Sequence, residues 1–254
     1  MKKLLISCII VVMLTSFGAF AEDLSALTLD QLTERRQQLL EELSQVNAAI
    51  SAASLQQPAA TPPTDGTLGR IIDLFPDENL AIMVMTNCGK ASIEQTVTQE
   101  DLDKVDMLTC IWEKYHDFTG IRYLRNLWYF HTEDNYDGPF PEELRYCRNL
   151  TSLYINCNRN IQEVPEWIGE LSKLETLSFS EDDVIVLPDS LCSLTKLKTL
   201  DLSRNERLTA LPENIGNLTK LDYLNINYTG ITSLPASAWN LTPSYFGMDG
   251  LPIK

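Results

Sequence analysis

The sequence has little positive charge. It contains 20 lysine and arginine residues against 35 aspartate and glutamate residues, with only two histidines. Without residues 1–21, which hold two lysines and no acid, 18 basic side chains face 35 acidic ones and the net charge is −17. Such a field repels phosphate backbones and anionic membrane surfaces and favours solubility. We therefore expect no nucleic acid among the partners.

Long apolar runs are absent after residue 14. The run from Leu4 to Leu14 follows Lys2 and Lys3, and the small-residue site Ala19 to Ala21 comes shortly after it. This order is typical of a secretory signal peptide, and the run is too short to span a bilayer comfortably. The sequence thus predicts a signal peptide over residues 1–21 and no stable membrane insertion after its cleavage. We expect an exported protein, secreted, extracellular or located in the cell envelope.

Motifs of catalysis and metal binding are also missing. Neither His116 nor His131 is accompanied by a glycine-flanked serine elbow or a phosphate-cradling loop. Adjacent acids such as Glu133 and Asp134 splay apart on a strand and make a poor glycosidase pair. The acidic run over residues 181–183 lacks the spaced oxygens of an EF-hand-like calcium loop. We therefore expect no enzyme activity, no cofactor and no metal ion.

Cysteines are few, and their number is odd once residues 1–21 are removed. The five that remain are Cys88, Cys110, Cys147, Cys157 and Cys192. No Cys-x-x-Cys spacing indicates a zinc site. Cys110 and Cys147 stand where related segments carry leucine, which favours small buried hydrophobic side chains over a disulfide. An exported protein can still oxidise one pair, and the sequence leaves that alternative open.

Five prolines recur in the second half of the chain with steps of 24, 23, 24 and 23 residues: Pro141, Pro165, Pro188, Pro212 and Pro235. A fixed period of this length indicates a repeat protein. A second pattern, Leu-x-x-Leu-x-apolar, begins at Leu150, Leu174, Leu197 and Leu221 with the same period. We predict six repeats, over residues 105–126, 127–149, 150–173, 174–196, 197–220 and 221–243.

The second half of each repeat carries a more specific signature. Residues 211–218 read Leu-Pro-Glu-Asn-Ile-Gly-Asn-Leu and residues 164–171 read Val-Pro-Glu-Trp-Ile-Gly-Glu-Leu. These units resemble leucine-rich repeats of the Leu-Pro-x-x-Ile-Gly-x-Leu variant. Residues 75–80 and 97–102 are similar to the helical N-terminal cap of bacterial internalin-like proteins. The resemblance implies an α/β solenoid, namely a right-handed leucine-rich-repeat solenoid with a parallel concave sheet and a helical cap.

An amphipathic helix is predicted ahead of these repeats. Leucine, valine and isoleucine recur at mostly three- and four-residue steps over residues 24–53, which suits either a short coiled coil that could form a homodimer or a helix docked on another surface. We divide the whole chain into a signal peptide (1–21), this helix (22–53), a flexible linker (54–67), a helical cap (68–104), the repeats (105–243) and a closing strand (244–254).

The repeat pattern also predicts which side chains face a partner. Side chains between the core leucines point to the opposite, concave face of the sheet, because strand side chains alternate. Aromatic residues gather there in the first repeats, and tyrosine and tryptophan are enriched in interface hot spots. They also favour strands for packing reasons alone. The expected contact residues are Trp112, Tyr129, His131, Tyr154, Asn156, Asp201, Arg204, Tyr223, Asn225 and Tyr228.

Two functions follow from this surface. The favoured one is an exported binding module that recognises a protein partner, basic or host-derived, through the concave sheet. The alternative is a carbohydrate-binding or cell-envelope structural protein, because aromatic residues together with Asn, Asp and Ser also suit sugars.

Overall fold

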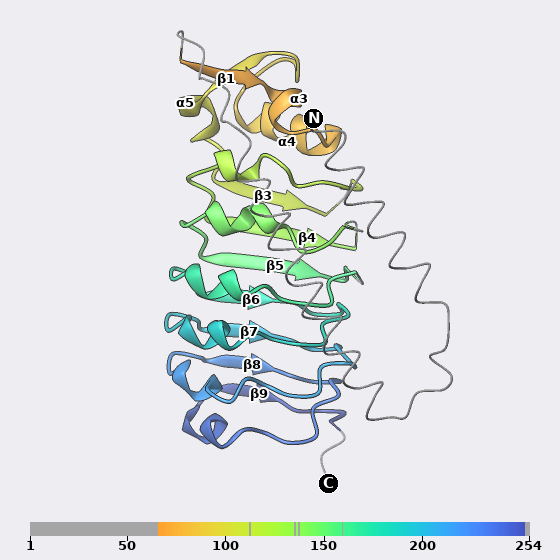
Figure 1. Ribbon diagram of the computed structural model, residues 1–254, viewed down its shortest axis with the longest axis vertical. Helices are drawn as coiled ribbons and strands as arrows, with labels where there is room; N and C mark the ends of the chain where they lie inside the picture. Colours follow the sequence, from red (N-terminus) through yellow and green to blue (C-terminus); the bar gives the residue numbers. More distant parts are fainter. Residues whose placement is uncertain (1–65, 112, 135, 137, 159, 252–254) are drawn as a thin grey trace, which may run out of the picture. The chain divides into compact units, whose positions relative to one another are not determined.

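The computed structural model describes residues 66–251 except 112, 135, 137 and 159. The predicted signal peptide, the amphipathic helix over 22–53 and the linker as far as residue 65 lie outside the described residues. Along the described part, a small N-terminal piece with short helices comes first and a seven-stranded sheet follows it (Figure 1).

The N-terminal piece, called the cap below, combines a two-stranded antiparallel sheet with short helices. Its elements are β1 (Thr67–Arg70), α3 (Ile71–Leu74), α4 (Glu78–Asn87), β2 (Thr96–Thr98) and α5 (Gln99–Leu102). The predicted start of helical structure at Leu68 is wrong, because that residue lies in β1. A four-residue strand gives too little alternation to be told from the start of a helix.

Two side-chain caps fix where the helices begin. Asp77 accepts a hydrogen bond from the Leu80 amide at 3.0 Å and starts α4. Thr98 and Asp101 form a complete capping box at the start of α5, as their three-residue spacing predicts. Such caps satisfy amides that the first turn of a helix leaves unpaired.

Asp77 also joins the cap to the first repeat. Its side chain is 9% exposed, and while one carboxylate oxygen caps α4, the other accepts from the His116 amide at 2.8 Å. Asn79 donates to the Lys114 carbonyl and Gln99 to the Tyr123 carbonyl. The cap is therefore tied to the repeats by polar contacts as well as by apolar packing.

The six repeats supply one parallel strand each, and the closing segment after them adds a seventh. The strands are β3 (Met107–Cys110), β4 (Tyr129–Glu133), β5 (Ser152–Asn156), β6 (Thr176–Ser178), β7 (Thr199–Asp201), β8 (Tyr223–Asn225) and β9 (Tyr245–Gly247). They are hydrogen-bonded in chain order, and every neighbouring pair is parallel (Figure 1). This arrangement confirms the predicted repeat solenoid with a parallel sheet.

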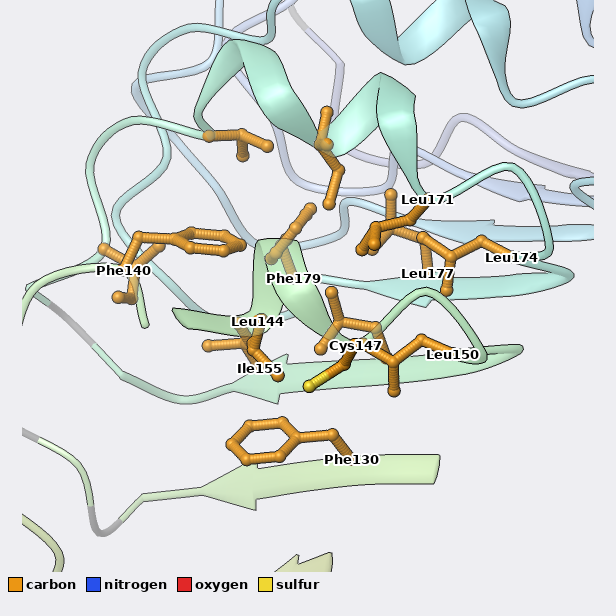
Figure 2. Packing of buried hydrophobic residues seen from close by; sticks show 14 of the residues in the cluster. Phe130, Phe140, Leu144, Cys147, Leu150, Ile155, Leu171, Leu174, Leu177 and Phe179 are labelled. Atoms are coloured by element: carbon orange, nitrogen blue, oxygen red, sulfur yellow. The ribbon is translucent and has the colours of Figure 1, made fainter. Parts of the chain in front are cut away.

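The core is a column of buried apolar side chains that passes from repeat to repeat. Figure 2 shows Phe130, Leu144, Cys147, Leu150 and Ile155 packed against one another, and none of the five is accessible to solvent. Cys110 is fully buried as well, so both cysteines at leucine positions act as core residues. The five cysteines of the described part are free thiols.

Short 3-10 helices form the return path of each repeat. They are η2 (Ile121–Tyr123), η3 (Glu142–Tyr146), η4 (Glu166–Glu170), η5 (Asp189–Ser193), η6 (Ile215–Asn217) and η7 (Ala236–Asn240). Two glycines allow neighbouring return paths to approach closely. A Cβ atom on Gly169 would lie 2.4 Å from the Ser190 carbonyl oxygen, and one on Gly216 would lie 2.1 Å from that of Ser237. The glycine of the Leu-Pro-x-x-Ile-Gly signature is thus required by backbone contact between repeats.

Buried polar side chains close the turns after the strands. The Asn205 side chain accepts from the Val184 amide and donates to the Phe179 and Leu202 carbonyls. Asn158 bridges to the preceding repeat in the same way, through the Tyr136 amide. Because these amides both donate and accept, they satisfy backbone groups of two repeats at once.

Candidate binding surface

The strand register places the predicted outward residues in two continuous columns. The first column contains Met107, Tyr129, Ser152, Thr176, Thr199, Tyr223 and Tyr245. The second contains Thr109, His131, Tyr154, Ser178, Asp201, Asn225 and Gly247. Up to β8 both columns match the predicted alignment residue by residue. The outward face of the sheet is therefore known at the level of single side chains.

Large side chains gather on the first three strands. We call Met107, Trp128, Tyr129, His131 and Tyr154 the first aromatic cluster. The Tyr129 ring lies 5.6 Å from the Tyr154 ring and 5.6 Å from the Trp128 ring, and His131 lies 5.3 Å from Tyr154. The Tyr129 hydroxyl is 3.4 Å from His131 Nδ1. The rings hold one another in place while part of each remains open to solvent, which suits a pre-organised contact site.

Two members of this cluster were not among the expected contact residues, although the repeat pattern already placed Met107 on the outward face. Trp128 is 38% exposed and Met107 is 41% exposed. Trp128 stands one position before the outward columns, directly after a core leucine, where it packs edge-on against Tyr129. The sequence does show a tryptophan directly before a tyrosine of the outward column, and this pair could have identified Trp128 as a contact residue. The expected contact Trp112 lies outside the described residues.

A second pair of rings lies at the other end of the sheet. Tyr223 and Tyr245, called the second aromatic cluster, stack with centroids 4.6 Å apart and an interplanar angle of 12°. Burial raises the pKa of Tyr223, with Asp201 adding to the effect, so its hydroxyl stays neutral at physiological pH. Tyr245 was not among the expected contact residues, although it lies in the predicted closing strand over residues 244–254.

Short polar side chains line the outward side of the sheet from β5 to β8. We call Asn156, Ser178, Ser180, Asp201, Ser203, Asn225 and Asn227 the polar strip. Asn156 accepts from the Ser178 hydroxyl and the Ser180 amide, and Asp201 accepts from the Ser203 hydroxyl and from Asn225. The strip is thus a connected hydrogen-bond network across the strands.

Asn225 differs from the expectation of an accessible contact residue. Its side chain is 8% exposed, because its amide donates to Asp201 and to the Tyr223 hydroxyl while its oxygen accepts from the Asn227 amide. Asn225 therefore positions its neighbours and offers little surface of its own. Asn156 and Asp201 remain partly exposed within the same network.

Arg204 and Tyr228 point outward for a different reason from the one predicted. They lie beyond the ends of β7 and β8, with φ angles of 61° and 55°, in the left-handed region. Asp134, Cys157 and Glu181 adopt the same conformation at equivalent positions. This turn, and not strand alternation, directs the two side chains outward. Simple alternation cannot predict it, because non-glycine residues seldom adopt positive φ.

These turns border an open cleft of about 790 Å³ at the edge of the sheet. Arg204 lies 3.5 Å from Glu181, and its guanidinium lies 5.9 Å from the Tyr228 ring centre. Arg207 pairs with Asp183 at 2.8 Å. Exposed pairs of this kind contribute little stability. They place charges of both signs around the cleft, next to Tyr228.

Asp182 occupies the asparagine position of its repeat. The side chain is 6% exposed, one oxygen accepts from the Asn158 amide, and the other has no hydrogen-bond partner among the described residues. Burial raises the pKa of this carboxyl to about 8. The group is therefore largely protonated at neutral pH.

Within the described part of the chain, no three His, Cys, Asp or Glu side chains are grouped closely enough to hold a metal ion. No helix in residues 66–251 is both long and apolar enough to cross a membrane.

Family models match three segments of the chain. Residues 46–103 match the internalin N-terminal model, described as bacterial adhesion/invasion protein N terminal. Residues 148–206 and 196–218 match two leucine-rich-repeat models. No curated protein sequence matches the chain.

Solved structures give the same picture. An internalin, InlF of Listeria monocytogenes, is 31% identical with a TM-score of 0.59 over 65% of this chain and 47% of that protein. The functional domain of InlJ from the same species is 21% identical, with a TM-score of 0.54 over 73% of this chain and 44% of that one. A leucine-rich-repeat protein of Leptospira interrogans is 22% identical, with a TM-score of 0.52 over 62% and 41%. The last two similarities concern the fold alone, and the chain spans less than half the length of all three proteins.

Proposed function

This chain is an internalin-like leucine-rich-repeat protein, and we propose that it binds a protein partner through the concave face of its sheet. Proteins with this fold are generally interaction modules without catalytic activity. The adhesion and invasion description of the N-terminal match supports a partner outside the producing cell, basic or host-derived. Solenoids present an extended concave surface for such partners.

The observation that carries the proposal is the first aromatic cluster. Tyr129, His131 and Tyr154 lie on neighbouring strands, are only partly buried, and contact one another across 5.3–6.3 Å. Aromatic anchors of this size contribute a disproportionate share of affinity when a partner excludes water around them. Fixed rings also lose little conformational freedom on binding.

Carbohydrate binding is the second candidate, and the ring geometry disfavours it. A sugar ring stacks flat on an exposed aromatic face. Tyr223 and Tyr245 stack on each other at 12°, so each covers one face of its neighbour. In the first cluster, Tyr154 is tilted by 43° against Tyr129, so the two rings do not form one flat platform. Tilted rings suit the irregular apolar and polar surface of a protein better.

Purified protein screened on an array of extracellular proteins and on a glycan array tests this proposal. We expect a protein target whose binding is lost in the double variant Tyr129→Ser, Tyr154→Ser and kept in Glu213→Ala, which alters an exposed convex residue. A target bound by the double variant as tightly as by the unchanged chain would contradict the concave assignment. Binding to glycans alone would favour the second candidate.

Export and self-association are further parts of the proposal. The signal-like N-terminus supports secretion or an envelope location, and the leucine pattern over residues 24–53 supports a homodimer. We expect the chain from Glu22 to have twice the protomer mass by light scattering and a chain from Thr67 to be monomeric. If the ratio of measured mass to protomer mass is the same for both chains, residues 24–53 do not form the homodimer and have another role.

A further inference from the structure

The concave face has two apolar regions separated by polar side chains. From this arrangement we infer the kind of partner that the face binds, and the inference rests on the proposed function. The first aromatic cluster occupies β3, β4 and β5, and the second occupies β8 and β9. The outward side chains of the two strands between them are Thr176, Ser178, Thr199 and Asp201. A partner that reaches both clusters must therefore span β6 and β7.

The separation of the clusters follows from the strand spacing. Neighbouring strands in a sheet lie about 4.8 Å apart, so β4 and β8 are about 19 Å apart and β4 and β9 about 24 Å. The midpoint of Tyr223 and Tyr245 thus lies about 21 Å from Tyr129. This distance is measured across the strands, along the stack of repeats.

The polar strip restricts the kind of segment that can cross it. On the two strands to be crossed, Ser178 already donates to Asn156, and Asp201 already accepts from the Ser203 hydroxyl and from Asn225. An extended peptide would bring its own unpaired N–H and C=O groups onto a surface whose hydrogen bonds are largely made, and each unpaired buried group is costly. An α-helix satisfies its backbone internally. The strip therefore favours a helix over an extended chain.

The geometry of an α-helix fits the separation of the clusters. Four turns rise about 21 Å, and residues i and i+14 lie on nearly the same face. Asp201 carries the charge among the outward side chains of β6 and β7. It would face the helix about two thirds of the way from the first anchor, where a basic residue is favoured over an acidic one.

We propose that the concave face accepts an amphipathic α-helix of the partner, lying across the strands. One apolar anchor contacts the first aromatic cluster, a second anchor four turns later contacts the second aromatic cluster, and a lysine or arginine between them faces Asp201. The ligand class is thus a basic amphipathic helix, used in a helix-on-surface mode of recognition.

Synthetic stapled helices of one length and one composition test the spacing. Leucine and phenylalanine anchors are placed at i and i+7, i and i+14, or i and i+18, which separates them by about 10, 21 and 27 Å on one face. Binding to the full chain is measured by fluorescence anisotropy at fixed salt concentration. We expect the i+14 peptide to bind at least tenfold more tightly than the other two.

Variants of the chain test the two contact regions separately. Tyr129→Ser and Tyr223→Ser should each weaken the i+14 peptide at least tenfold and remove the spacing preference, while Glu213→Ala leaves both unchanged. Tyr223→Phe keeps the ring and removes the hydroxyl that accepts from Asn225, so it should retain most of the affinity. Asp201→Asn should reduce affinity a few-fold and flatten its dependence on salt.

The outcomes separate this inference from the proposed function. Equal affinity for all three spacings, no binding of any peptide, or loss in Tyr129→Ser without loss in Tyr223→Ser overturns the helix inference. The proposed function survives each of these results if a protein target from the array still depends on the concave residues. It fails if that target is indifferent to Tyr129 and Tyr154.

Discussion

The two faces of the same sheet follow opposite rules. On the inward face, Leu153, Leu177, Leu200 and Leu224 are in register and all four are inaccessible to solvent. On the outward face, the residues one position earlier on the same strands are Ser152, Thr176, Thr199 and Tyr223. The inward face repeats one residue type because each strand meets the same packing environment. The outward face changes from strand to strand, and the proposed recognition depends on these differences.

Substitutions on the two faces of β7 give the largest expected difference in the free energy of unfolding. Leu200→Ala should lower the free energy of unfolding by about 2–5 kcal/mol, because the cavity is enclosed by adjacent repeats and cannot collapse fully. Thr199→Ala, one residue away on the outward face, should change it by less than about 0.5 kcal/mol. Denaturant unfolding of both variants measures the contrast, and similar losses would show that the inward and outward assignments are wrong.

For affinity, in contrast to stability, substitutions on the outward face should have the large effect. Tyr129→Ala or Tyr154→Ala should weaken binding of the protein partner by about 2 kcal/mol or more, because each removes a central aromatic anchor. Glu213→Ala on the convex side should leave the affinity unchanged. Isothermal titration with the target from the array measures these values. Loss of affinity in the convex variant alone would mean that the binding face has been assigned backwards.

A smaller effect on stability is expected at a buried position where one repeat carries a carboxyl group and its neighbours carry an amide. Asp182 stands where Asn158 and Asn205 stand in neighbouring repeats, and its folded-state pKa of about 8 lies above the ordinary value of 3.8. The folded state therefore favours the protonated carboxyl. Its stabilising contribution is complete below about pH 4 and is lost as the pH rises from about 4 to 8. Asp182→Asn should raise stability at pH 8 on the order of 1–3 kcal/mol, because the amide can donate where the carboxylate cannot.

Thermal unfolding between pH 4 and pH 9 checks this prediction. The unchanged chain should lose stability across the range more steeply than Asp182→Asn does. Glu206→Gln, at an exposed residue of the same cleft, should follow the unchanged chain. A pH profile that is the same with and without the carboxyl of Asp182 would contradict its burial as a protonated group.

Much of the fold was predictable because one pattern recurs many times. The leucine spacing aligned Tyr129 with Ser152 and His131 with Tyr154, and the register confirms both pairs. When one repeat deviates from the pattern, the regular spacing of the neighbouring repeats still fixes its alignment. The cap offers no such repetition, which is why the strand over residues 67–70 was taken for the start of a helix.

The candidate site was harder to predict for three physical reasons. Trp128 joins the first cluster from just outside the strand columns, so its role depends on packing against Tyr129 and not on alternation. Arg204 and Tyr228 point outward through left-handed turns that strand geometry does not describe. Asn225 is mostly covered because its neighbours consume its hydrogen-bonding groups. None of these features follows from strand alternation alone, and Asn225 depends in addition on Asp201 of the neighbouring strand.

The carboxyl of Asp182 has a consequence for cooperativity. In a stack where each repeat contacts mainly its neighbours, stability is a sum of repeat and interface terms, and a weak interface divides the array into separately folding blocks. Asp182 meets Asn158 of the preceding repeat at the junction between β5 and β6. As the pH rises from about 4 to 8, the stability that this buried carboxyl contributes at the junction is lost. The two aromatic clusters lie on opposite sides of the junction, so its strength governs how firmly the two proposed contact regions are held relative to each other.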